Sequence, residues 1–334
     1  MLHRFAKFVA GCTVLLVLAG SLVTSTDSGL SVPDWPTTYG WNMFTFPPSK
    51  WVGGIFYEHG HRLIASTVGF LTIVLAGWIW FADSRRWLRW FGVGALVSVV
   101  AQGLLGGLTV IYLLPAAVST AHAGLAEIFF CMTVAIALFT SPGWIEGYGD
   151  QGVDDPALRR LTTAATVFIF TQILIGAAMR HTGAGLAIPD FPWMFGHVIP
   201  DHWSAAIAVH FTHRIGAIIV AGIVLGTSIY VWLRHQDRPE LARPATLIIF
   251  LVIIQLTLGG LTVISRRNVL VNSLHVMVGA LVLTTSLLLT LRSWRLRFAA
   301  QRPEPQSSPS TQSNEHMVSA ASARSAVKRG EVRA

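Results

Sequence analysis

Eight segments of the chain are long and apolar enough to cross a lipid bilayer, and no other feature constrains its fold as strongly. A helix needs roughly 20 apolar residues to span the ~30 Å hydrocarbon core. Such segments recur at about 8–24, 63–81, 91–112, 118–140, 161–179, 206–233, 245–264 and 270–291. Only 12% of the 334 residues are charged, against about 25% in a typical soluble chain. The sequence therefore predicts an all-α integral membrane protein with eight transmembrane helices.

Basic residues gather in alternate connecting segments, which predicts how the chain is oriented in the membrane. They precede the first span and follow the second, fourth, sixth and last: Arg4, Lys7, Arg85, Arg86, Arg89, Arg159, Arg160, Arg234, Arg238, Arg243, Arg292, Arg295 and Arg297. Lys and Arg accumulate on the cytoplasmic side. We therefore expect a multi-pass protein of the cell (inner) membrane with both termini cytoplasmic. Because the +8 formal charge is spread over loops, we expect no nucleic-acid partner.

The two cysteines, Cys12 and Cys131, both lie inside predicted spans. The sequence therefore predicts no disulfide and no zinc site. The basic and then apolar N-terminus is interpreted as a retained first helix, because no cleavage site followed by a soluble domain is evident.

The chain contains two copies of one unit. The segment 28-SGLSVPDWPTTYG-40 returns as 184-AGLAIPDFPWMFG-196, and 106-GGLTV-110 returns as 259-GGLTV-263. Four spans per copy bring the chain back to its starting side, so the copies are parallel repeats about an axis along the membrane normal. We expect two four-helix bundles, at 1–140 and 161–291. A cytoplasmic linker is expected at 141–160 and a disordered cytoplasmic tail at 292–334.

Four histidines follow the repeat and lie at the same end of their spans. Ionisable residues at membrane depth are costly and mark functional sites by default. Two imidazoles from two helices of a bundle suit the axial positions of haem iron. The predicted iron ligands are His61 and His122 in the first half, and His213 and His275 in the second. The alternative is a set of helix-end histidines hydrogen-bonded at the membrane interface.

The two halves differ at two places. Glu58 lies one turn from His61 on the same helix face, whereas the matching residue in the second half is His210. A carboxylate there can take a proton or stabilise positive charge, which predicts chemistry in the first half. An ion pair with Arg62 is the alternative.

The second difference is a pair of arginines present only in the second half. Arg266 and Arg267 stand where the first half has Leu113 and Leu114. Two guanidiniums beside His275 would suit the propionates of a bound haem. Interfacial snorkelling of the two side chains is the alternative.

Two paired loops and a glycine motif complete the pattern. Pro33-Asp34-Trp35-Pro36 and Pro189-Asp190-Phe191-Pro192 predict stiff lids over the two sites, with plain interfacial turns as the alternative. Gly103 and Gly107 predict a close helix–helix contact. His59, His181, His197 and His202 have no histidine partner in the repeat and are expected in outer loops.

Taken together these motifs resemble the haem A synthase family, over about residues 20–291. The resemblance rests on Glu58-x-x-His61-Arg62, the loop 29–36, the repeat, and His122, His213 and His275. It implies an enzyme that oxidises the C8 methyl group of haem O to a formyl group by successive hydroxylations, for aa-type cytochrome oxidases. It also implies haem O between His61 and His122, Glu58 as the essential acid, and a haem b cofactor between His213 and His275.

The resemblance further implies a haem O synthase and oxidase assembly factors as partners, besides the bilayer and an electron acceptor that the sequence does not identify. Many members carry a cysteine pair in the first outer loop, and this chain has none there. A mechanism that needs loop thiols is therefore excluded. Two alternatives remain: a di-haem b electron-transfer protein, which leaves the Glu58/His210 difference unexplained, and a non-catalytic haem-delivery factor.

Overall fold

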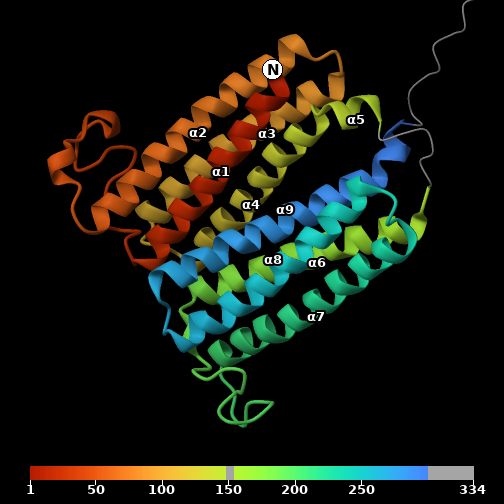
Figure 1. Cartoon of the computed structure of the whole chain (residues 1–334). Helices are drawn as coiled ribbons and strands as arrows, with labels where there is room; N and C mark the ends of the chain where they lie inside the picture. The colour runs from red at the N-terminus through yellow and green to blue at the C-terminus, as the bar shows by residue number, and fades with distance from the viewer. Residues whose placement is uncertain (148–153, 300–334) are drawn as a thin grey trace, which may run out of the picture. The chain divides into compact units, whose positions relative to one another are not determined.

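The computed structural model describes residues 1–147 and 154–299, with side chains up to residue 295. Eight long helices lie in this part of the chain (Figure 1): α1 Leu2–Ser25, α2 Gly54–Ala82, α3 Arg86–Ile111, α4 Ala116–Phe139, α6 Pro156–His181, α7 Ala205–Arg234, α8 Pro239–Ile264 and α9 Val269–Ala299. Each is long and apolar enough to cross a membrane, and the described residues contain no strand. The all-α membrane fold predicted from the sequence is confirmed.

The helices are longer than the apolar segments that reveal them. Helix α2 begins at Gly54, well before the apolar run that starts at Leu63, and α9 continues beyond Leu291 to Ala299. A helix satisfies its own main-chain hydrogen bonds, so it can continue through polar residues at the membrane surface. Short helices follow α4 (α5, Pro142–Glu146) and occur in the loops: η1 Met43–Thr45, η2 Pro48–Lys50 and η3 Ala184–Leu186. The rest of the expected linker, 148–153, and the expected tail from residue 300 lie outside the described residues.

The helices form two four-helix bundles related by the repeat. In the first, α1 and α3 each pack against both α2 and α4. In the second, α7 packs against α6 and α8, and α9 is hydrogen-bonded to α6. Between the bundles, α4 contacts α6, and Ser273 Oγ of α9 donates to Ser25 Oγ of α1 at 2.9 Å. The two contacts correspond to each other under the sequence repeat.

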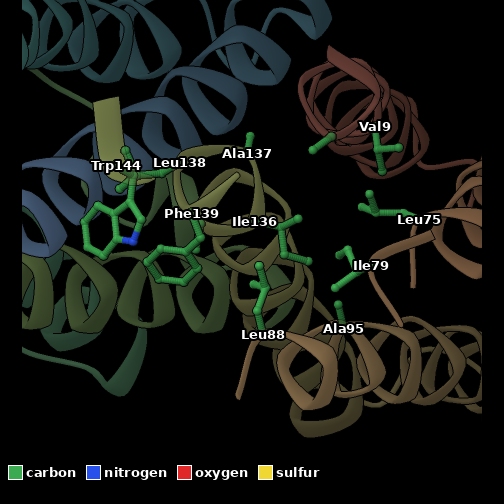
Figure 2. Close-up of a cluster of buried hydrophobic side chains, with 12 residues drawn as sticks. Val9, Leu75, Ile79, Leu88, Ala95, Ile136, Ala137, Leu138, Phe139 and Trp144 are labelled. Atoms are coloured by element: carbon green, nitrogen blue, oxygen red, sulfur yellow. The ribbon is translucent and has the colours of Figure 1, made fainter. Parts of the chain in front are cut away.

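A dense apolar core closes the first bundle at one end (Figure 2). It joins Val9 of α1, Leu75 and Ile79 of α2, Leu88 of α3 and Ile136 of α4. The aromatic rings of Phe139 and Trp144 extend it, with centroids 4.9 Å apart. The second bundle has a smaller core at the corresponding end, made of Leu158, Val231, Leu241, Ala245 and Leu289. The four repeated histidines lie toward the opposite end of the two bundles.

That opposite end carries the two long connecting segments, 26–53 and 182–204, and we call it the loop end (Figure 1). Its backbone repeats between the halves. Tyr39 and Gly40 have positive φ, as do Phe195 and Gly196 at the matching positions. The pair Leu113–Leu114 shares this conformation with Arg266–Arg267. The two halves therefore keep the same loop geometry where their side chains differ.

Candidate functional site

The four repeated histidines lie within roughly two helical turns of the loop end, and each ring is pressed against a glycine of a neighbouring helix. A Cβ added to any of these glycines would lie between 2.8 and 3.2 Å from the Cε1 atom of the imidazole. The pairs are Gly20 with His61, Gly106 with His122, Gly176 with His213, and Gly259 with His275. Because real Cβ atoms rarely come so close, even alanine would displace the rings. The sequence keeps glycine where an imidazole must approach the backbone.

The histidines meet in pairs. His61 of α2 lies near His122 of α4, and His275 of α9 lies near His213 of α7. In the first half the Nδ1 atoms of both rings are buried without a hydrogen-bond partner among the described residues. Buried polar atoms of this kind call for an unseen partner.

The pairs suit haem better than a bare metal ion. Within residues 1–147 and 154–299, no group of three or more His, Cys, Asp or Glu side chains is arranged to hold a metal ion. A bare ion usually needs three or four protein ligands, whereas haem iron takes two axial ones from facing helices. The residues present therefore fit an axially ligated haem in each half.

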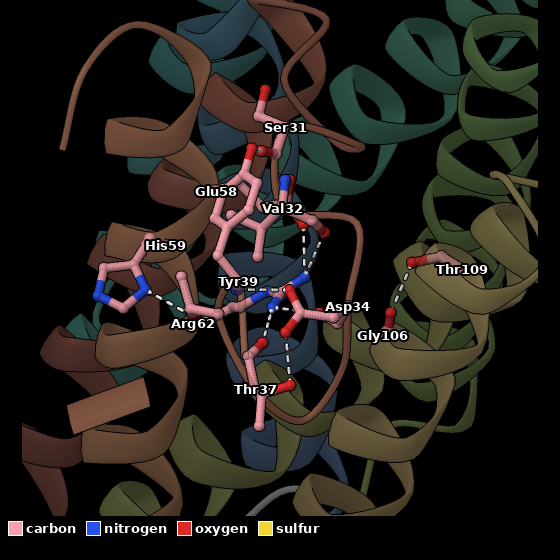
Figure 3. A network of polar contacts seen from close by, with 11 residues as sticks. Ser31, Val32, Asp34, Thr37, Tyr39, Glu58, His59, Arg62, Gly106 and Thr109 are labelled. Atoms are coloured by element: carbon pink, nitrogen blue, oxygen red, sulfur yellow. Dashed lines mark hydrogen bonds and ion pairs between the residues drawn. The ribbon is translucent and has the colours of Figure 1, made fainter. Parts of the chain in front are cut away.

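Glu58 of α2 contacts the loop that precedes this helix (Figure 3). Its Oε2 accepts a hydrogen bond from Val32 N at 2.8 Å, and its Oε1 accepts one from Arg62 Nη2 at 2.7 Å. The ion pair with Arg62 that the sequence left as an alternative is thus present. The same guanidinium donates to the backbone oxygens of Val32, Asp34 and Thr37. Glu58 and Arg62 together clamp the loop to α2.

The second half builds the same clamp without a carboxylate. Ile188 N lies 3.2 Å from the Nδ1 of His210, and Arg214 Nε lies 3.1 Å from its Nε2; a neutral imidazole accepts a hydrogen bond from only one of these two N–H groups. Arg214 also donates to the backbone oxygens of Ile188 and Asp190. His210 reproduces the loop contact of Glu58 but brings no negative charge, so the difference between the halves is one of charge at an equivalent position.

Both loops fold against the helices as stiff lids. Asp34 accepts hydrogen bonds from Tyr39 N and Gly40 N, and Asp190 accepts the matching bonds from Phe195 N and Gly196 N. Each closes its own loop in this way.

An aromatic side chain docks each lid on the bundle. A Cβ on Gly107 would lie 2.6 Å from the Trp35 ring, and one on Gly260 would lie 2.7 Å from the Phe191 ring. In each repeated Gly-Gly pair, the first glycine thus accommodates a histidine and the second accommodates a lid aromatic. The expected contact at Gly103 is wrong, because a Cβ there would meet open space.

The lids should lose order in acid. Burial opposes ionisation of Asp34, but the hydrogen bonds from Gly40, Thr37 and Tyr39 outweigh it and lower the pKa of the carboxyl. A group with a lowered folded-state pKa stabilises above its ordinary pKa, and this contribution is lost as the pH falls through the folded-state value. Hydrogen-exchange protection of the Tyr39 and Gly40 amides should therefore hold from neutral pH to about 3.8 and fall below it.

Asp34→Asn supplies the control for this prediction, since it keeps the shape but removes the charge. Its protection should be weaker at neutral pH and independent of acid. Full protection in the variant at neutral pH would show that the charge does not order the lid.

Arg266 and Arg267 lie at the loop end beside the first bundle. The Nη2 of Arg267 is 3.8 Å from Asp27 Oδ1, at the end of α1. Another arginine of this junction escaped sequence reading: Arg180 of α6 donates to Ser21 O at 2.8 Å and to Ser25 Oγ at 3.0 Å. The sequence does show a basic residue near the end of a span. Arginines at span ends often only extend their charged heads to the membrane surface, so this position alone did not indicate a contact between the bundles.

Three more residues were missed or misplaced by sequence reading. His59, expected in an outer loop, is fully buried in α2 beside Thr38, Phe46 and Trp51. Glu127 is buried in α4, and its Oε2 has no hydrogen-bond partner among the described residues. An acidic residue inside an apolar span is the sequence feature that could have identified it. Gln172 lies within hydrogen-bond distance of His213, and no histidine spacing points to it.

The comparisons with known proteins agree with this geometry. The family model described as COX15-CtaA, cytochrome oxidase assembly protein, matches residues 3–287. The chain belongs to the COX15-CtaA family. Among curated proteins, one called "Heme A synthase" from Symbiobacterium thermophilum is 30% identical over 78% of this chain and 85% of its own length. Another of that name, from Halalkalibacterium halodurans, is 26% identical over 85% of this chain and 95% of its own length.

The matched region of the COX15-CtaA model contains every residue of the two candidate sites. All four histidines, the four glycines beneath them, both lids and Glu58 fall within residues 3–287. The family assignment therefore applies to both halves of the repeat.

Proposed function

We propose that the chain is a haem A synthase, an oxidoreductase that converts haem O to haem A by oxidising the C8 methyl group to a formyl group. One observation carries the proposal: the two halves repeat a histidine pair set on glycines, and only the first half adds a carboxylate, Glu58. The names of the curated relatives support it.

The difference between the halves suggests how the roles divide. In our proposal the first half binds the substrate haem between His61 and His122, and Glu58 holds or accepts a proton close to the reacting group. The lid over this half excludes water, since Trp35 seats it on Gly107.

The second half would hold haem b between His213 and His275, with Arg266 and Arg267 near its propionates. Haem b, when bound, supplies one-electron transfer. The chain's own part is to fix the two rings against Gly176 and Gly259 and to close the lid with Arg214. No carboxylate stands at the Glu58 position here, as expected for a site that holds a cofactor and does not transform it.

The proposed setting is the cell (inner) membrane with both termini in the cytoplasm, following the distribution of Lys and Arg. A haem O synthase and oxidase assembly factors are the proposed partners, besides an electron acceptor of unidentified nature. The bilayer surrounds the eight spans, and no nucleic-acid partner is proposed.

Haem identity tests the proposal. The protein is purified from cells that make haem O, and its haems are extracted and separated by chromatography. We expect haem b together with haem O or haem A. Haem b alone, filling both halves, would overturn the proposal in favour of a di-haem b electron-transfer protein.

A further inference from the structure

Arg180 is a cation at the loop end of α6 whose side chain points into the protein. Its Nη2 donates to Ser21 O at 2.8 Å and to Ser25 Oγ at 3.0 Å, both on helix α1 of the first bundle. Ser21 lies one turn deeper in α1 than Ser25, and both serines are buried. An arginine that snorkels carries its charged head outward to water. Arg180 reaches inward, so snorkelling does not account for its position.

The positive charge of Arg180 has no carboxylate partner among the described residues. Its Nε is buried there without a hydrogen-bond partner. The carboxylate of Asp27 is nearby, but this side chain is 84% exposed and lies 3.8 Å from Arg267. Two guanidiniums thus share one exposed carboxylate. An unpaired charge at membrane depth is costly and marks a functional site by default.

The guanidinium of Arg180 lies beside the histidine pair of the second half. Gly176, beneath the ring of His213, precedes Arg180 by one turn of α6, so the two residues share a helix face. His275, the other predicted ligand of this half, also lies near Arg180. Arg180 therefore stands on the loop-end side of the second histidine pair.

The first half has no matching charge. The residue that corresponds to Arg180 there is Thr24, one turn after Gly20. Its hydroxyl donates to Gly20 O at 3.3 Å, within its own helix. The two arginines that do recur in the repeat, Arg62 and Arg214, donate to backbone oxygens of the lids. Arg180 therefore adds a positive charge to the second half alone.

A guanidinium of this kind binds carboxylates and phosphates through charge-assisted hydrogen bonds. Two sources of such an anion exist at the loop end: a carboxylate of a bound haem and the phosphate of a lipid headgroup. The haem is favoured, because the guanidinium points inward and lies near a predicted iron ligand.

We propose that Arg180 binds a propionate of the haem held between His213 and His275. Ser21 and Ser25 fix one end of the guanidinium, and the buried Nε is available for the anion. The inference rests on the proposed function, since it assumes a resident haem in the second half.

Release of haem from a protein that holds only one haem tests the inference. His61→Ala is the background, so that haem b of the second half is the haem that is followed. Arg180→Gln removes the charge in question. Arg234→Gln is the matched control, because it removes an equal charge from an exposed position at the other end of the second bundle.

Each haem-loaded protein in detergent is mixed with apomyoglobin as haem acceptor, and release is followed by absorption. The emptied proteins are then reloaded with haem b or with its dimethyl ester, whose propionates carry no charge, and release is measured again. Recovery of the original spectrum with haem b shows that the emptied protein has kept its fold.

We expect Arg180→Gln to speed the release of haem b by about tenfold or more, since a hydrogen bond to a charged group is worth about 10–100-fold. Release of the dimethyl ester should be equally fast with and without Arg180. Arg180→Lys keeps the charge but loses the planar fork, so it should give an intermediate rate for haem b and the same rate for the ester. Arg234→Gln should change neither rate.

The outcomes separate a propionate contact from the other roles of Arg180. Equal acceleration of haem b and its ester would show that Arg180 only joins the two bundles, and would overturn the inference. Unchanged release of haem b would overturn it too. If Arg180→Gln then also lost bound phospholipid, measured by mass spectrometry, the anion would be a lipid phosphate. Should Arg180→Gln fail to fold, Arg180→Lys decides by the same comparison of haem b with its ester.

The proposed function is judged separately, by the haems of the unchanged protein. Haem b alone in both halves would overturn the proposed function, while the comparison at Arg180 would still report on the second half. Haem O or haem A beside haem b, with no effect of Arg180→Gln on haem b release, would overturn the inference alone.

Discussion

Replacement of Glu58 with glutamine is expected to lower the conversion of haem O by about 100-fold or more, while haem b content stays unchanged. A side chain that gives or takes a proton in the transition state contributes about 10²–10⁴-fold. Glutamine keeps the size of Glu58 and can still accept the bond from Val32 N, so the lid contact survives. The charge that Arg62 neutralises is lost. Conversion is measured by chromatography of extracted haems, and haem b by its reduced absorption spectrum.

Glu58→His separates chemistry from clamping. In the second half the ring of His210 contacts both a loop amide, Ile188 N, and the guanidinium of Arg214, and it can accept a hydrogen bond from one of them. The variant should therefore keep the lid ordered, measured as hydrogen-exchange protection of the Tyr39 and Gly40 amides, and still lose conversion. If conversion persisted in Glu58→His, Glu58 would be a clamp residue and no more. Loss of haem b in either variant would contradict the division of roles between the halves.

The fold could be predicted almost completely, because each of its determinants is visible in one stretch of sequence. A membrane span depends on its own apolar length, and a repeat of two four-span units leaves little freedom in topology. The starts of helices were less visible. The spacing of Glu58 and His61 indicated a helix there, but the apolar segment begins only at Leu63 and does not show that the helix starts at Gly54.

The candidate site was predictable where the repeat copied it and unpredictable where contacts join different helices. The four histidines recur in both halves, so comparison of the halves singles them out. The roles of Gly20 and Gly176 depend on how closely α1 approaches α2 and α6 approaches α7, and spacing along one helix cannot show that distance. Gln172 escaped for the same reason, since its partner His213 lies on another helix.

The asymmetry at Glu58 was predicted correctly as a difference in residue type but incompletely as a difference in structure. Comparison of the two halves showed that His210 occupies the position equivalent to Glu58. It left two possible roles for Glu58: proton transfer or an ion pair with Arg62. The structure contains the ion pair. It also contains a hydrogen bond from the Val32 amide to Glu58, which no sequence pattern near Glu58 predicts. A loop far from Glu58 in sequence thus determines how its carboxylate is held.

Substitution of single axial histidines should remove one haem at a time. His213→Ala is expected to lower haem b content by at least about tenfold, since losing a ligand costs more than losing its outer partner, which costs about 10–100-fold. Haem O or haem A should remain bound in the first half, and conversion should fall with haem b. His61→Ala should do the opposite: haem b stays, and haem O binding and conversion are lost. Haem content is measured after extraction, per mole of protein.

Matched variants keep this prediction specific. Each alanine removes a ring packed on a glycine, Gly20 for His61 and Gly176 for His213, so the two substitutions leave similar space between helices. Any general loosening of the bundle would lower both haems in both variants. His59→Ala removes a buried ring of α2 that contacts Thr38 and not the site, and it should leave both haems in place. If His61→Ala released haem b and His213→Ala did not, the assignment of the halves would be reversed, and the charge at Glu58 would then mark the resident haem and not the reacting one.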